Sequence, residues 1–149
     1  MIIREANLAD CEHLDNLLTK LIRYESEYNS NISSEYIVRD NYVERIETEG
    51  QKAFVAVDED IIVGYLYGFI YQIPKLFIRP VAFLDALYVE EKYRRTGIAK
   101  KLFNEFRKFA LKNGACNIEL KVLSNNENAL SLYKELGFCR NIDYMSLTL

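Results

Sequence analysis

The sequence contains few of the residues that define several protein classes. Only six glycines and two prolines occur in 149 residues, which excludes a collagen-like or low-complexity chain, and the 50% hydrophobic content excludes disorder. The longest uncharged stretch, Ile61 to Pro74, is too short to cross a bilayer, which takes about 20 residues. The N-terminal segment carries a charge at Arg4 and has no apolar run, so we expect no signal peptide and a cytoplasmic location.

Residues that bind metals or form disulfides are also scarce. The chain has one histidine, His13, and an odd number of cysteines, Cys11, Cys116 and Cys139, without a Cys-x-x-Cys pair. A disulfide framework and a zinc site are therefore disfavoured. Cys11 and His13 stand two residues apart, so on a helix their side chains point in different directions and do not form a catalytic pair. We expect Cys116 and Cys139 to be small buried apolar residues and the protein to use no metal.

Charge is distributed unevenly along the chain. The net charge is −3, but the segment from Lys92 to Lys112 carries +7, which leaves −10 on the remainder. A basic island in an acidic protein indicates a bound anion, which could belong to nucleic acid, a membrane or a phosphorylated small molecule. The acidic remainder and an isoelectric point near 5.3 disfavour nucleic acid.

No repeat or linker divides the chain, so we expect one domain over residues 1–149. Hydrophobic periodicity predicts the element order β-α-α-β-β-β-α-β-α-β-β. The predicted segments are a strand at 2–6, a helix capped by Asn7 or Asp10 and carrying Leu14 to Leu21, a helix at 34–48, strands at 53–57 and 61–71, a loop at 73–80, a strand at 81–89, a helix from 96 to about 113, a strand at 116–123, a helix at 126–136 and strands at 138–142 and 143–149. This order predicts a single-domain α/β fold, a mixed and mostly antiparallel sheet with helices on both faces.

The turn between the strand at 81–89 and the following helix has the character of an anion site. The first four N–H groups of a helix lack intrahelical partners and carry partial positive charge. Gly97 and the small Ala99 would let a ligand approach that backbone closely, and Arg94 and Arg95 add positive charge. The alternative is a plain helix start with solvated charges. Neither a P-loop nor a dinucleotide-binding fingerprint is present.

A second motif about thirty residues later decides between these interpretations. Arg94, Gly97 and Ala99 match the pattern [Q/R]-x-x-G-x-[G/A]. The later pattern N-x-x-A-x-x-x-Y-x-x-x-G-F is matched by Asn126, Ala129, Tyr133, Gly137 and Phe138. With both motifs in this order and spacing, the sequence resembles the GNAT superfamily of N-acetyltransferases. The resemblance implies a GNAT-like acyl-CoA N-acyltransferase fold and acetyl-CoA as the acetyl donor.

The resemblance also implies which residues bind acetyl-CoA. The amides from Arg95 to Lys100 would hold the pyrophosphate, the strand end would align with the pantetheine arm, and an N–H near Val89 would polarise the thioester carbonyl. Asn126 would contact pantetheine or simply cap its helix. The implied cofactor-binding residues are Leu87, Tyr88, Val89, Arg94, Arg95, Thr96, Gly97, Ile98, Ala99, Lys100 and Asn126.

Two residues are candidates for proton transfer. The resemblance implies that Tyr133 protonates the departing thiolate, although a core tyrosine would also fit an amphipathic helix. Asp85 is the only charged residue in its strand. Because burying an unpaired carboxylate is costly in free energy, we expect Asp85 to have a specific role. It is either the base that deprotonates the amine, as in some polyamine acetyltransferases, or a structural carboxylate held by backbone donors or by Arg79.

The identity of the acceptor substrate is the property that the sequence determines least. In the family its site is built from segments that correspond here to residues 22–36 and 72–80. Acidic and aromatic groups in the first segment suit a cationic amine, although they could be an ordinary solvated face. These candidate substrate residues are Tyr24, Glu25, Glu27 and Tyr28, with Asp85 beside them and with Glu35 and Tyr36 further along.

The resemblance implies acetyl transfer to a primary amine of a small molecule, for which a cationic, polyamine-like amine is one candidate. Because no cysteine stands out as an acyl carrier, direct attack in a ternary complex is expected. Amino acids, aminoglycosides and protein N-termini or lysines remain alternative acceptors. A non-catalytic acyl-CoA sensor is the competing function. We expect no nucleic acid or membrane partner, and a homodimer is one option for the assembly.

Overall fold

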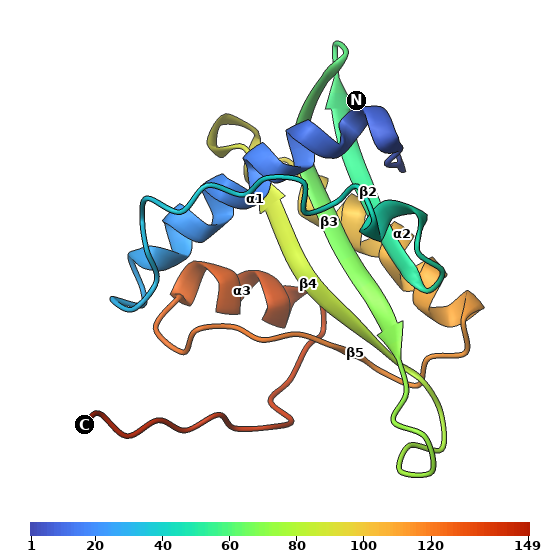
Figure 1. Ribbon diagram of the computed structural model, residues 1–149, viewed down its shortest axis with the longest axis vertical. Helices are drawn as coiled ribbons and strands as arrows, with labels where there is room; N and C mark the ends of the chain where they lie inside the picture. The colour runs from blue at the N-terminus through green and yellow to red at the C-terminus, as the bar shows by residue number, and fades with distance from the viewer.

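A mixed five-stranded sheet forms the centre of the protein. The computed structural model describes all residues, 1–149. The strands lie in the order β1-β2-β3-β4-β5, and every neighbouring pair is antiparallel except the last (Figure 1). The elements are β1 (Ile2–Glu5), α1 (Cys11–Ser26), β2 (Gln51–Asp58), β3 (Ile61–Tyr71), β4 (Val81–Val89), α2 (Ile98–Lys112), β5 (Ile118–Glu119) and α3 (Glu127–Glu135). The predicted α/β class and mostly antiparallel sheet are confirmed.

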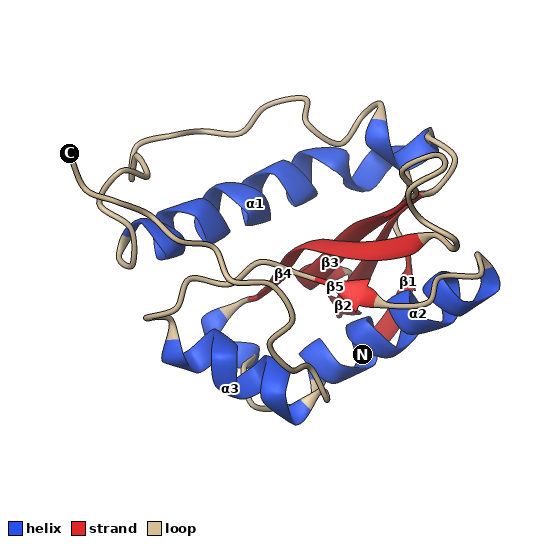
Figure 2. Cartoon of the chain, turned by 90° about the horizontal axis from the view of Figure 1, so that it is seen from below, coloured by secondary structure: helices blue, strands red, loops and turns tan.

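The helices cover both faces of the sheet, as predicted. Figure 2 shows α1 above the sheet and α2 and α3 below it. Two buried apolar clusters correspond to these two faces, one packed under α2 and one packed under α1. On the α2 face, a Cβ added to Gly68 would meet the ring of Phe106 at 2.4 Å. The absence of a side chain at Gly68 therefore allows α2 to lie directly on β3.

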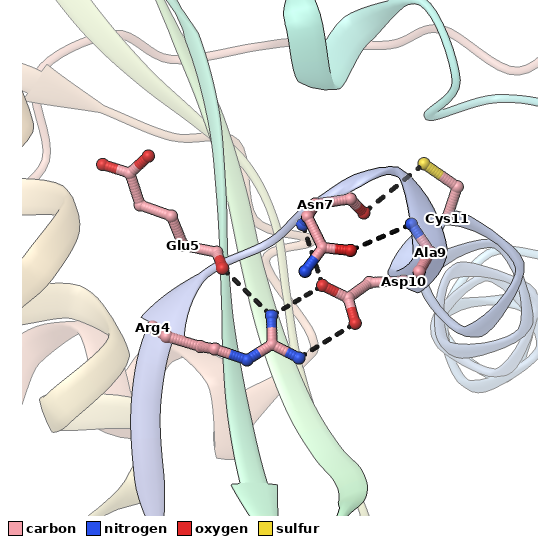
Figure 3. Close-up of polar contacts among 6 residues, drawn as sticks. All are labelled: Arg4, Glu5, Asn7, Ala9, Asp10 and Cys11. Carbon is pink, nitrogen blue, oxygen red and sulfur yellow. Dashed lines mark hydrogen bonds and ion pairs between the residues drawn. The ribbon is translucent and has the colours of Figure 1, made fainter.

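The start of α1 is tied to β1 by a polar cluster (Figure 3). Asn7 Oδ1 accepts the backbone N–H of Ala9 at 2.9 Å, and the Asp10 carboxylate accepts the N–H of Asn7 at 2.8 Å. Arg4 donates to both oxygens of Asp10, at 2.7 and 3.0 Å, and this hydrogen bonding lowers the pKa of the Asp10 carboxyl. Asn7 thus caps the 3-10 turn Leu8–Asp10 that leads into α1, whereas Asp10, the N-cap residue of α1 itself, makes no side-chain capping bond to that helix.

The sheet opens between β4 and β5. Only two residue pairs join these strands, Ala82 with Ile118 and Phe83 with Glu119. The predicted strand at 116–123 is therefore wrong in length, because the chain diverges from β4 after Glu119 and finds no other partner strand. From Leu84 to Val89, the edge of β4 that faces β5 lacks a neighbouring strand. This opening leads toward the N-terminus of α2.

The predicted helix at 34–48 is wrong. The segment is extended loop followed by a short 3-10 turn at Arg45–Glu47. In its first part the backbone bonds to side chains of α1: Val38 N–H donates to Thr19 Oγ1 at 3.0 Å, and Asn41 N–H donates to Asp15 Oδ1 at 3.2 Å. These contacts bury Val38 and Tyr42 without a helix, so tertiary hydrogen bonds outweigh the local pattern.

The C-terminal strands predicted at 138–142 and 143–149 are also absent. Residues 138–149 contain no regular secondary structure, and the apolar side chains from Ile142 onward are exposed, because no strand lies beside them to complete a ladder. Cys116 and Cys139 are exposed rather than buried, which corrects that expectation, whereas Cys11 is buried. No helix of the protein is both long enough and apolar enough to span a membrane.

Candidate active site

The N-terminus of α2 presents a run of free amides. Gly97 caps the helix with φ +84°, and Arg95 is also left-handed, with φ +62°. These angles bend the chain so that the N–H groups from Arg95 to Lys100 form no hydrogen bond within the protein. No atom lies within 4 Å of the place where a Gly97 side chain would begin, so an anion can reach this backbone. The sequence-predicted residues Thr96, Ile98 and Ala99 all belong to this run.

The turn that leads to these amides is fixed by Arg94. Its Nε donates to the carbonyl of Val89 at 2.9 Å. The guanidinium lies between two aromatic rings, 5.4 Å from the centre of Tyr24 and 5.5 Å from that of Tyr88. Arg94 thereby connects the end of β4, which includes Leu87, to α1 and to the start of α2. The predicted cofactor residues of β4 and of the turn form one continuous surface.

Helix α3 brings Asn126 and Tyr133 to the same region. Asn126 is buried and its Oδ1 accepts the N–H of Ala129 at 3.2 Å, so it caps α3, which was one of its two expected roles. The Tyr133 ring packs edge-on against Phe138, with centroids 5.7 Å apart, and its hydroxyl has no hydrogen-bond partner in the protein. Burial, with the nearby charge of Glu25, raises the pKa of Tyr133 to about 12. The phenol is therefore protonated at neutral pH.

Asp85 is the extra residue of a β-bulge. The pairing of β3 with β4 passes from Tyr67–Ala86 directly to Gly68–Leu84, so Asp85 has no partner across the strand. Its side chain is accessible to solvent, which explains how this strand tolerates a charge. Asp85 forms no ion pair in the structure, so its carboxylate is not paired with Arg79.

The electrostatics around Asp85 connect the two proposed proton-transfer groups. Partial burial raises the pKa of the Asp85 carboxyl, while the charges of Arg45 and Lys121 act in the opposite direction. Burial also raises the pKa of Glu25, and the charge of Asp85 adds to this effect. The charge of Glu25 in turn contributes to the raised pKa of Tyr133, after burial as the main cause. Glu25 on α1 is therefore within electrostatic reach of both Asp85 on β4 and Tyr133 on α3.

The other residues expected at the acceptor site take different positions. Tyr24 and Tyr28 share a hydroxyl contact of 3.0 Å, and α3 meets them through Asn128, whose Nδ2 lies 3.4 Å from the Tyr24 hydroxyl. They therefore connect α1 to α3 beside Arg94. Glu27 is exposed at the C-terminal cap of α1, and Glu35 and Tyr36 are exposed in the following loop.

A cluster of tyrosines beside Asp85 was missed from the sequence. Tyr42 and Tyr65 are buried with their hydroxyls 3.0 Å apart, and Tyr67 packs against Tyr42 with ring centroids 5.2 Å apart. The charge of Asp85 contributes to the raised pKa of all three phenols, after burial as the main cause. The i, i+2 spacing of Tyr65 and Tyr67 places both on one face of a strand, which was a usable signal.

Comparisons with known proteins agree with this geometry. The model of the acetyltransferase (GNAT) family matches residues 17–138. The pig (Sus scrofa) thialysine N-epsilon-acetyltransferase is 31% identical over 144 residues, which cover 92% of this chain and 83% of that protein. Among solved structures, a variant of the BH1408 protein of Bacillus halodurans has a TM-score of 0.90 at 26% identity and covers 100% of this chain and 99% of its own.

A more distant structure shows the same fold with coenzyme A bound. The aminoglycoside N-acetyltransferase AAC(6')-Iy in complex with CoA has a TM-score of 0.72 at 20% identity, covering 99% of this chain and 100% of its own. The fold, the free amides at α2 and the family match lead to one conclusion. The chain belongs to the GNAT family of acetyltransferases, and it is an N-acetyltransferase that uses acetyl-CoA to acetylate amines.

Proposed function

We propose that the protein transfers the acetyl group of acetyl-CoA directly to a primary amine of a small cationic molecule, in a complex that holds both substrates. The observation that carries this proposal is the position of the unpartnered amides from Arg95 to Lys100 at the end of the open edge of β4. Phosphate oxygens accept hydrogen bonds from such amides, and the helix dipole of α2 favours their charge. The pantetheine arm would then lie along β4 toward Asp85.

The chemistry requires the amine nitrogen to lose two protons and the CoA sulfur to gain one. A protonated amine must first lose a proton, and the accessible Asp85 carboxylate accepts it directly or through water. The amine nitrogen then attacks the thioester carbonyl, and an N–H near Val89 stabilises the oxyanion. When the carbon–sulfur bond breaks, Tyr133 gives its proton to the thiolate of CoA, and the second proton of the attacking nitrogen returns through water to the Tyr133 phenolate. Its pKa of about 12 keeps that proton available at neutral pH.

The acceptor's charge follows from the groups around Asp85. Glu25 is a second carboxylate near Asp85, and burial, which disfavours the charged form, is the main cause of the raised pKa of both carboxyls. Neither carboxylate forms an ion pair within the protein. A cationic amine would relieve this cost by supplying the missing positive charge. The similarity to an enzyme named for acetylating thialysine supports a small amine as the acceptor.

The test is thiol release from acetyl-CoA across a panel of amines that contains polyamines, amino acids, aminoglycosides and peptides. We expect acetylated product from a small cationic amine, and initial-rate lines that intersect when both substrates are varied. Binding of CoA without product from any amine would instead identify an acyl-CoA sensor. Product from peptides alone would make the protein a peptide N-acetyltransferase.

A further inference from the structure

Arg45 lies in the 3-10 turn before β2, and a phenol holds its guanidinium in place. Its Nη1 donates to Tyr67 Oη at 3.2 Å, and its guanidinium carbon lies 5.7 Å from the centre of the Tyr67 ring. The hydroxyl of Tyr67 donates onward to Gln51 Oε1 of β2. An arginine that is otherwise exposed is thus fixed to the sheet at a defined position.

The hydrogen-bonding capacity of Arg45 is mostly unused. A guanidinium has five N–H donors, and only one of them is bonded within the protein. None of the ion pairs in the molecule includes Arg45. The planar fork of donors on arginine matches the two oxygens of a carboxylate. Arg45 therefore has the properties of a receptor for a carboxylate that does not belong to this chain.

The position of Arg45 relates it to the acceptor rather than to CoA. Tyr67 pairs with Ala86, the residue that follows Asp85 in the bulge. The charge of Arg45 acts on Asp85, although the two side chains form no ion pair. With Glu25 on the α1 side of Asp85, the acceptor region has a negative part and a positive part. A molecule with an amine at one end and a carboxylate at the other would match both.

We propose that Arg45 binds the carboxylate of the acceptor, which is therefore an amino acid with a second amine on its side chain rather than a plain polyamine. This inference rests on the proposed function, because it assumes that amine transfer takes place beside Asp85. A polyamine would bring a second positive charge toward Arg45, and like charges repel. An amino acid of the same length would gain a charge-assisted pair of hydrogen bonds at that position.

The experiment compares acceptors that differ only in the carboxylate. L-ornithine is paired with 1,4-diaminobutane, and L-lysine with 1,5-diaminopentane. For the unmodified enzyme we expect kcat/KM to be at least about tenfold higher with each amino acid, the scale of one charge-assisted contact. Arg45→Gln should lower kcat/KM for the amino acids by about 10- to 100-fold, mainly through KM, and leave the diamines unchanged or improved. Arg45→Lys should restore part of the loss.

Lys121→Gln is the matched control, because Lys121 also acts on the charge of Asp85 but its ammonium lies over Tyr144, 4.7 Å from the ring centre. It should leave the preference for amino acids intact. An equal loss for amino acids and diamines in Arg45→Gln would show that Arg45 only supports Tyr67, and would overturn the inference. So would equal use of both acceptor types by the unmodified enzyme. If no amine of either type is acetylated, the proposed function itself fails.

Discussion

In the proposed arrangement, the two substrates of this enzyme meet different kinds of groups. The surface for acetyl-CoA consists mainly of backbone, namely the amides from Arg95 to Lys100 and the open edge of β4. The surface for the acceptor consists of side chains that come from α1, β3, β4 and the turn at Arg45. Backbone donors depend on the path of the chain, whereas side-chain groups depend on the identity of each residue. Substitutions should therefore affect the two surfaces in different ways.

The two surfaces also differ in charge. The start of α2 combines its helix dipole with a segment of charge +7. The acceptor surface holds Glu25 and Asp85, both with a raised pKa. An anionic cofactor and a cationic amine are thereby directed to opposite ends of one site. In the proposed arrangement the transferred acetyl group would lie where these ends meet, close to Tyr133.

The largest loss of activity is expected from a substitution that disrupts the backbone surface proposed for acetyl-CoA. Gly97→Glu adds a side chain at φ +84°, where L-residues are strained, and puts a negative charge where the pyrophosphate would lie. We expect CoA to stop raising the melting temperature and activity to fall to background, because ligand stabilisation requires binding.

Gly114→Glu is the control for backbone strain. Gly114 also has a positive φ, +72°, and no atom within 4 Å of its missing side chain, but it lies beyond the other end of α2. This variant should lose some stability and keep the full response to CoA. If Gly97→Glu binds CoA as well as the control does, the pyrophosphate is held elsewhere.

A smaller effect is expected at the junction of the two surfaces. Tyr133→Phe removes only the hydroxyl and keeps the ring that packs on Phe138. Because the phenol acts after the amine has attacked, kcat and kcat/KM should fall together by about 10- to 100-fold, with unchanged affinity for acetyl-CoA. Tyr71→Phe, which removes a phenol bonded to Glu119 away from the site, should have little effect on turnover. Unchanged turnover in Tyr133→Phe, where chemistry limits the rate, would make this residue a core aromatic.

The difference between backbone and side-chain surfaces also explains what could be predicted from the sequence. A cradle of amides needs a glycine at a left-handed position after a strand, and Gly97 between Val89 and an amphipathic helix supplied that signal. The cap of α3 at Asn126 was visible for the same reason, since local geometry requires it. Both features depend on a few neighbouring residues.

The acceptor surface depends on contacts across long sequence separations. Arg45 contacts Tyr67 from a segment that was expected to be helical. Hydrogen bonds from the backbone of that segment to the side chains of Thr19 and Asp15 on α1 keep its first part in an extended conformation instead. No local sequence pattern indicates contacts between residues so far apart in the chain. The predicted strands after Glu119 failed similarly, because strand formation needs a neighbour, and periodicity within the segment does not supply one.

The next largest effect is expected from substitution of Asp85, and its size should depend on pH. Burial raises the pKa of Asp85, so in the unmodified enzyme the base is lost as pH falls through that raised value. Asp85→Asn should lower the rate by about tenfold or more near neutrality, and recover partly at high pH, where more of the amine is already unprotonated. The measurement is kcat/KM against pH for both enzymes.

Stability separates this role from a structural one. A carboxyl with a raised folded-state pKa binds its proton more tightly in the folded protein, so stability is greatest below the unfolded pKa and decreases as pH rises through the folded value. Asp85→Asn removes that cost and should be at least as stable as the unmodified enzyme at neutral pH. A uniform loss of rate at every pH, together with lower stability, would contradict the assignment of Asp85 as the base.

The smallest expected effect concerns the segment that forms the acceptor surface. Thr19 donates its hydroxyl to the carbonyl of Asp15 at 2.9 Å and accepts the N–H of Val38 at 3.0 Å, and both bonds are buried. Thr19→Val keeps the shape but leaves the N–H of Val38 without an acceptor. We expect the free energy of unfolding to fall by about 1–3 kcal/mol in urea titrations, and KM for the amine to rise without a change in CoA binding.

Thr48→Val provides the comparison for this variant. Thr48 also donates to the carbonyl four residues earlier, Glu44 at 2.7 Å, but it is exposed and accepts no distant amide. Surface substitutions of this kind usually change stability by about 0.5 kcal/mol or less. Since the two variants lose the same local bond, their difference measures the link between α1 and the loop at Val38. Equal stability of the two variants would show that this link does not hold the acceptor surface in place.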